Sequence, residues 1–218
     1  MTSWQKKKLL EKGINKQIVV IPNPLSCDFE KIVRQEIPTK NSSGRINILT
    51  MARVVEGKGV DLAVEAMAFL PPSCQMTVAG DGDLLPTLKK RVHSLGIADR
   101  VHFVGWLRGA KKKQFLSDAD LFCLPSQLDS FGMVFMEAMS FGLPVIALGN
   151  GPICDVVPHG QAGTLVDQPH PQQIAAAILP FLENPEKRRH AGEGGKRWVV
   201  SHYSAKEVGN KLLALCQA

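Results

Sequence analysis

The sequence lacks long apolar runs, paired cysteines and a high content of aromatic residues. No apolar stretch approaches the ~20 residues that a membrane-spanning helix needs, and the basic start is not followed by the apolar stretch of a signal peptide. The five cysteines are scattered and form no C-x-x-C pair, which argues against disulfides and a zinc site and predicts a reducing compartment with most thiols in the core.

Aromatic residues make up only 6% of the chain, whereas its net charge is +6 with a sequence pI near 9.1. The charge predicts an anionic partner such as a nucleotide phosphate, an acidic membrane surface or a nucleic acid. No aromatic residue lies within the basic clusters at 6–8, 111–113 and 187–189. Because single-stranded nucleic acids bind on aromatic stacking platforms, we expect no nucleic-acid partner.

Short apolar runs alternate with segments of helical spacing. The runs lie at 46–51, 75–79, 101–104, 121–124 and 145–148, and the helical segments between them lie at 60–70, 84–95, 110–117 and 132–141. Further helices are predicted at 171–183, 185–201 and 205–216, and a short strand at 17–21. This alternation predicts one doubly wound, Rossmann-like α/β domain over residues 1–218, with a parallel sheet and helices on both faces.

Ligands of such sheets bind at the carboxyl ends of the strands, and two groups of residues are expected there. Arg53 and Lys58 follow the first run together with Gly57 and Gly59. A guanidinium and an ammonium beside glycines that admit a close backbone approach would suit a diphosphate. A surface loop with solvated charges explains these four residues equally well.

Glu137 is the only charged residue from Phe131 through Leu143, so the helix predicted at 132–141 should be buried nearly all round. A buried carboxylate needs hydrogen-bond partners, and helical side chains tilt toward the helix start, where Asp129 lies. Backbone amides there suit phosphate oxygens. The alternative is that Glu137 meets a structural partner and Asp129 caps the helix.

The chain resembles the C-terminal domain of family 4 retaining glycosyltransferases, whose two Rossmann-like domains form the GT-B architecture. The carboxylate pair is matched from Asp129 to Met139, and the phosphate element by Arg53, Lys58 and Gly59. Other matches lie at 21–24, 79–82, 101–105, 142–147 and 151–160. The resemblance implies a hexosyltransferase of carbohydrate biosynthesis that needs no metal or cofactor and uses a UDP-sugar or GDP-sugar donor.

The resemblance also implies the role of each site residue. Arg53 and Lys58 would hold the donor diphosphate and stabilise the leaving group, Glu137 would bind the ribose hydroxyls, and Asp129 would hold the transferred sugar. The remaining donor contacts would come from Gly80, Gly105, Trp106, Leu107, Phe131, Gly132, Met133 and Val134. Asp129 stands where the family has Glu, Ala52 where Gly is common and Asp155 where Glu is common.

By this resemblance an N-terminal acceptor-binding domain is missing from the sequence, and the isolated domain should bind a donor without turning it over. The expected location is cytoplasmic, with peripheral attachment to the inner membrane face through the full-length protein as a further expectation. One alternative is a non-catalytic nucleotide-binding module. A nicotinamide-binding domain is a weaker one, because Gly80-Asp81-Gly82 lacks a third glycine and follows the second strand.

Overall fold

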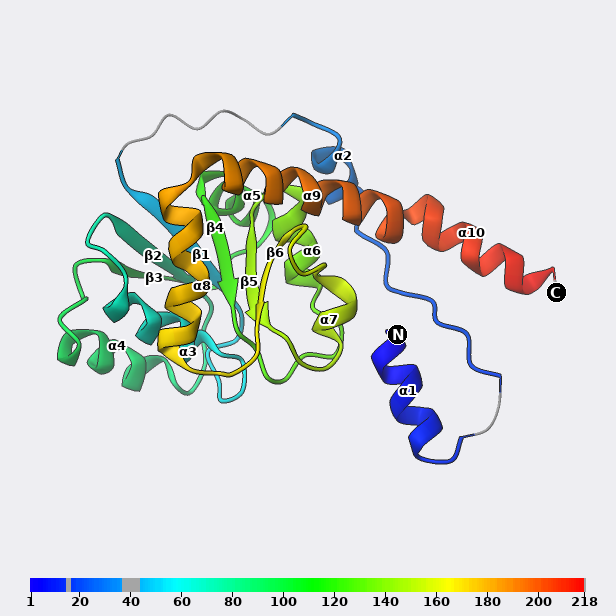
Figure 1. The fold of residues 1–218 in the computed structure, drawn as a ribbon, viewed down its shortest axis with the longest axis horizontal. Coiled ribbons are helices and arrows are strands. Elements are labelled where there is room, and N and C mark those ends of the chain that lie inside the picture. Colours follow the sequence, from blue (N-terminus) through cyan, green and yellow to red (C-terminus); the bar gives the residue numbers. More distant parts are fainter. Residues whose placement is uncertain (15–16, 37–43, 218) are drawn as a thin grey trace.

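The computed structural model describes residues 1–14, 17–36 and 44–217 and contains a six-stranded sheet in the order β3-β2-β1-β4-β5-β6 (Figure 1). All strand pairs are parallel. The strands are β1 (Ile46–Met51), β2 (Cys74–Ala79), β3 (Val101–Gly105), β4 (Leu121–Leu124), β5 (Val145–Leu148) and β6 (Gly163–Val166). The strand order reverses between β1 and β4, which is where a doubly wound sheet opens a crevice for a ligand.

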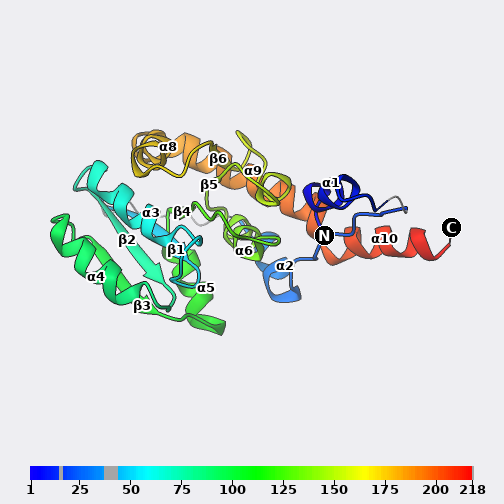
Figure 2. The same ribbon diagram turned by 90° about the horizontal axis from the view of Figure 1, so that it is seen from below.

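Helices cover both faces of this sheet because its central strands are apolar on both sides. Every residue of β4 and β5 is buried. Figure 2 shows α8 and α5 on opposite sides of the strands. The elements that follow the strands are α3 (Val60–Ala66), the 3-10 turn η1 (Met67–Phe69), α4 (Leu85–Ser94), α5 (Gly109–Asp118), α6 (Met133–Ser140), α7 (Ile153–Val156) and α8 (Pro171–Glu183). The predicted Rossmann-like fold is therefore confirmed.

The C-terminal helices α9 (Pro185–Tyr203) and α10 (Ala205–Cys216) have the predicted positions. Glycines let α9 approach the rest of the domain closely. A Cβ atom at Gly192 would lie 2.1 Å from the carbonyl oxygen of Gly142, and one at Gly194 would lie 2.0 Å from that of Gln161. Helix α10 extends beyond the sheet at the end where α1 (Ser3–Glu11) also lies (Figure 1).

Several local predictions are wrong. Residues 17–21 form no strand and pair with no neighbour in the sheet; instead the N-terminal ammonium donates to the carbonyl of Ile21 at 2.7 Å. The α-helix predicted at 60–70 ends at Ala66, and the 3-10 turn η1 follows it directly. The structure adds β6, α7, α2 (Cys27–Val33) and α1, which begins with a capping box between Thr2 and Gln5.

The cysteines also differ from expectation. Cys74 and Cys123 are buried, whereas Cys27, Cys154 and Cys216 are exposed, so the prediction that most thiols lie in the core is wrong. The three exposed thiols lie in helices, where an apolar sequence neighbourhood does not fix which side faces the core. Within the described ranges, no helix combines the length and apolarity that crossing a bilayer requires.

Candidate functional site

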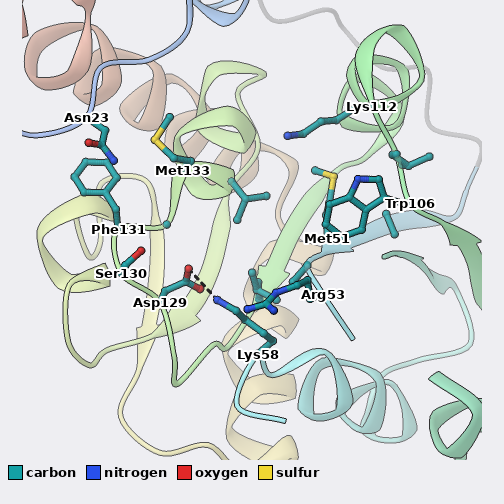
Figure 3. A pocket seen from close by; sticks show the side chains of 16 residues that line it. Asn23, Met51, Arg53, Lys58, Trp106, Lys112, Asp129, Ser130, Phe131 and Met133 are labelled. Carbon is teal, nitrogen blue, oxygen red and sulfur yellow. Dashed lines mark ion pairs between the residues drawn. The ribbon is translucent and has the colours of Figure 1, made fainter. Parts of the chain in front are cut away.

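A cavity of about 350 Å³ lies at the carboxyl ends of β1, β2 and β4 (Figure 3). Its position matches the switch in strand order between β1 and β4. Its walls come from the strand ends, the segment after β3, the start of α5 and the loop that leads into α6. The lining residues are Asn23, Met51, Ala52, Arg53, Lys58, Ala79, Trp106, Leu107, Lys112, Leu124, Asp129, Ser130, Phe131, Gly132, Met133 and Val134.

Lys58 and Asp129 meet on one wall of the cavity and point toward one another in Figure 3. The Nζ atom of Lys58 lies 3.2 Å from Oδ1 of Asp129 and donates to the carbonyl of Leu128 at 2.5 Å. The two side chains are only 17% and 16% exposed. The loop after β1 and the loop after β4 are thus joined through the predicted site residues.

Glycines make this meeting of loops possible. Gly57 and Gly59 have positive φ angles of 78° and 72°, a left-handed conformation that favours glycine. The carbonyl of Gly57 accepts from the amides of Gln127 at 2.8 Å and Leu128 at 3.0 Å. A Cβ atom at Gly59 would lie 2.2 Å from the carbonyl oxygen of Pro125. The solvated-loop alternative is therefore wrong for Lys58, whereas Arg53 is exposed, as that alternative expects.

The start of α6 forms the adjoining wall. Its N-cap is Gly132, with a φ of 84° and no side-chain capping bond, so the alternative that Asp129 caps this helix is wrong. The first amides of a helix have no acceptor within the helix, which leaves those at Met133 and Val134 suited to an anion. Phe131 is held from behind by Tyr203, whose ring meets it edge-on at 5.9 Å between centroids.

Two residues support this wall from outside the cavity. The Tyr203 hydroxyl donates to the carbonyl of Asp155 at 2.7 Å, and burial raises the pKa of Tyr203 to about 12, which keeps it a donor. From α1, the side-chain amide of Gln5 donates to the carbonyl of Ser130 at 2.9 Å. The loop between Asp129 and α6 is thereby fixed by the N-terminal helix and by the end of α9.

Glu137 is not among the residues that line the cavity. Its Oε2 atom is buried and lies 2.5 Å from Nζ of Lys112, which does line the cavity. This contact is a charge pair without hydrogen-bond geometry, because no hydrogen-bond partner meets Oε2 among the described residues. The structural partner considered from sequence thus exists, and it is itself a residue of the cavity.

Most of the predicted donor residues line the cavity. Gly80, Gly105 and Glu137 do not. The amide of Gly80 donates to the carbonyl of Gly105 at 2.8 Å, and a Cβ atom at Gly80 would lie 1.8 Å from the carbonyl oxygen of Ala52. These glycines therefore allow the strand ends to converge beneath the site. Gly80 follows β2, whereas the glycines of a dinucleotide-binding site follow the first strand. Its position therefore disfavours a nicotinamide site.

The sequence patterns did not predict Lys112, Asn23 and Ser130 as cavity residues, nor the strand-end residues Met51, Ala52, Ala79 and Leu124. Asn23 lies in the segment at 21–24 whose residues resemble the family, and this resemblance is a signal by which the sequence indicates it. With Lys112 included, three cations and one carboxylate line the cavity, which favours an anionic ligand. Among the described residues, no group of three or more histidines, cysteines or carboxylates is arranged to hold a metal.

Known proteins were then compared with this chain, and they identify its family. The family model described as glycosyl transferases group 1 matches residues 33–198. The chain belongs to this family. It is 28% identical over 212 residues to the uncharacterized glycosyltransferase YqgM of Bacillus subtilis, covering 96% of this chain and 58% of that protein.

Two further relatives are informative. A GDP-mannose-dependent alpha-(1-6)-phosphatidylinositol monomannoside mannosyltransferase of Mycobacterium tuberculosis is 28% identical over 178 residues, covering 77% of this chain and 46% of that protein. The crystal structure of Staphylococcus aureus TarM, whose ligands include UDP, matches with a TM-score of 0.82 at 20% identity, over 100% of this chain and 43% of that one. The group 1 domain thus spans about half the length of these relatives, and TarM supports its fold.

Proposed function

We propose that this group 1 glycosyltransferase domain binds a nucleoside-diphosphate sugar in the cavity between β1 and β4. The observation that best supports the proposal is the convergence of Arg53, Lys58 and the first amides of α6 on one cavity at the switch point. The mannosyltransferase relative is named for GDP-mannose and the TarM crystal contains UDP, which supports UDP or GDP as the nucleotide.

In this proposal the diphosphate lies between the cations and the start of α6. Arg53 offers a planar fork of donors and Lys58 an ammonium held by Asp129 and the Leu128 carbonyl, while the amides of Met133 and Val134 complete the contacts. When the bond to the sugar breaks, negative charge develops on the leaving diphosphate. Cations held in place before the reaction stabilise that charge without reorganising, which lowers the barrier to transfer.

The sugar and the nucleoside occupy the two ends of the cavity. Asp129 and the amides of Phe131 and Gly132 would hold the sugar hydroxyls, and Glu137 would reach the ribose past Lys112. The segment Gly105–Leu107 would receive the base. Transfer with retention of the anomeric configuration, and an acceptor bound by another part of the full-length protein, complete the proposed activity.

A thermal-shift panel with UDP, GDP, ADP and NAD tests the binding step. A ligand at about 100 times its Kd stabilises a domain by ~2.7 kcal/mol, which for this size means a rise in Tm of roughly 5–10 °C. We expect UDP or GDP to give such a rise, and Lys58→Ala or Glu137→Ala to abolish it. Stabilisation by NAD alone would instead identify a nicotinamide site, and no shift with any nucleoside diphosphate at millimolar concentration would refute the proposal.

Retention needs a separate measurement on the full-length protein. Proton NMR during transfer of the donor sugar distinguishes the two anomers of the product. We expect the product to have the same anomeric configuration as the donor. A product of opposite configuration would exclude retention. A full-length protein that binds the donor but transfers nothing would instead support the non-catalytic alternative.

A further inference from the structure

Lys112 is a third cation of the cavity, and it lies at the opposite end from the Lys58–Asp129 pair. Figure 3 shows its side chain extending from the α5 wall, near Trp106 and away from Lys58. Its neighbours in the basic triplet have other surroundings: Lys111 is exposed, and Lys113 pairs with Asp28 at 2.8 Å. Only the middle lysine of the three thus lines the cavity.

The Lys112 ammonium is held in place by Glu137. Its Nζ atom lies 2.5 Å from Glu137 Oε2 and 5.8 Å from the centroid of the Phe29 ring, and the lysine side chain is 24% exposed. A lysine ammonium has three N–H donors and no acceptor. One close carboxylate oxygen can occupy only one of them, so N–H groups remain for a ligand in the cavity.

The surroundings of Lys112 are those proposed for the nucleoside. Leu107 is buried in the wall after β3, and Trp106, which is 53% exposed, offers a ring face at the rim. Such a face stacks on any base and therefore does not distinguish one base from another. A hydrogen bond to the edge of the base is needed for selection, and Lys112 supplies a fixed donor beside this wall.

We propose, on the basis of the nucleotide site proposed above, that Lys112 selects the base by donating to an exocyclic carbonyl oxygen. Uracil and guanine present such an oxygen, at O4 and O6, where cytosine and adenine present an amino group that only donates. An ammonium facing an amino group places two donors together and leaves both without an acceptor. The site therefore accepts UDP or GDP and rejects CDP and ADP.

UDP and CDP make the sharpest test because their bases differ at this exocyclic position and at the adjacent ring nitrogen. The dissociation constants of UDP, CDP, GDP and ADP would be measured by isothermal titration calorimetry. We expect the wild-type domain to bind UDP about tenfold or more tightly than CDP, because a donor to a mismatched base loses its hydrogen bond. In Lys112→Met this ratio falls toward one, chiefly through weaker UDP binding.

Two further variants distinguish selection of the base by Lys112 from other effects of its positive charge. Lys112→Gln offers an amide oxygen as well as a donor, so it should retain UDP binding and improve CDP binding. Lys111→Met removes the adjacent exposed lysine and should leave all four constants unchanged. Melting temperatures of each variant show whether Glu137, left without its partner, destabilises the fold.

The outcomes distinguish this inference from the function on which it rests. An equal loss of all four nucleotides in Lys112→Met, or a UDP-to-CDP ratio that does not change, would overturn base reading by Lys112 while leaving the nucleotide site standing. Wild-type preference for CDP or ADP would also overturn it. Failure of the wild-type domain to bind any of the four would refute the proposed function itself.

Discussion

Asp129 has two opposing effects on a bound donor. Its carboxylate lies 3.2 Å from the Lys58 ammonium, so it competes with a diphosphate for that cation while offering acceptors to a sugar. Asp129→Asn keeps the shape and removes the charge. We expect UDP or GDP alone to bind roughly 2–5 times more tightly to this variant, because a partly exposed like-charge repulsion is worth little more than that.

The matching sugar nucleotide should lose its advantage over the free diphosphate in the same variant, since the sugar acceptor is weakened. Calorimetric titration of both ligands measures the two effects. Asp83→Asn removes a carboxylate from an exposed position outside the cavity lining and serves as the control. Weaker binding of the free diphosphate to Asp129→Asn would contradict this description of the pair.

Site residues that follow a strand end or belong to one sequence motif were predictable from the sequence. Site residues that come together only through the packing of separate helices were not. Arg53, Lys58 and Asp129 follow strand ends, and the topology of a parallel sheet brings such ends together. Lys112 belongs to a basic triplet that looks like a solvated helix face. Its contact with Glu137 depends on how α5 lies against α6, which no local pattern specifies.

The loop between β1 and α3 is the element that shapes the phosphate end of the cavity. Gly59→Ala would place a side chain in the left-handed region and 2.2 Å from the Pro125 carbonyl oxygen. Gly96 has a similar φ of 66°, but a Cβ atom there would meet nothing within 4 Å. Comparing Ala at the two sites therefore separates backbone strain from the close approach of the two loops.

We expect Gly96→Ala to lower the free energy of unfolding by roughly 1–2 kcal/mol, the usual cost of a left-handed alanine. Gly59→Ala should cost about 1–3 kcal/mol more, as overpacking of a close contact does. It should also weaken nucleotide binding, because the Lys58 loop must move. Urea unfolding measures the first effect, and equal losses at the two sites would show that the loops can separate freely.

Long apolar runs were predictable as elements, whereas short or amphipathic ones were not. β4 and β5 are continuous buried runs, which a parallel sheet requires. β6 was missed because Gly163-Thr164-Leu165-Val166 has only two large apolar residues and lies at the sheet edge. The run at 17–21 has strand-like residues, but it has no neighbouring strand with which to form a ladder.

At the scale of the whole molecule, thiol reactivity reports which surfaces are open. Cys27, Cys154 and Cys216 are exposed, whereas Cys74 and Cys123 are buried, and burial raises the pKa of both buried thiols. We expect a disulfide reagent at pH 8 to modify three thiols in the native protein and the other two only on unfolding. Mass spectrometry after timed quenching identifies the order.

Cys154 should react more slowly than the other two exposed thiols, because burial and then the charge of Asp155 raise its pKa and lower the thiolate fraction. Rapid modification of Cys123 in the native protein would mean that the β4 region opens more readily than its packing indicates.

The site lies where the strand order reverses, as the general rule for ligands of open α/β sheets expects. The reversal between β1 and β4 is what brings Arg53 and Lys58 opposite the start of α6. What topology does not specify is the chemistry of each wall. The charge pairs Lys58–Asp129 and Lys112–Glu137 at the two ends of the cavity depend on side chains from different crossover elements.

The most direct test of the nucleotide site is calorimetric titration of UDP and GDP into the wild-type domain and a variant with Arg53→Met and Lys58→Met. The site predicts that at least one nucleotide binds the wild type, and that the variant binds it at least about tenfold more weakly, because two charged contacts to the diphosphate are lost. Lys90→Met, which removes an exposed lysine outside the cavity, should bind like the wild type. Equal affinity of the double variant and the wild type would contradict the site.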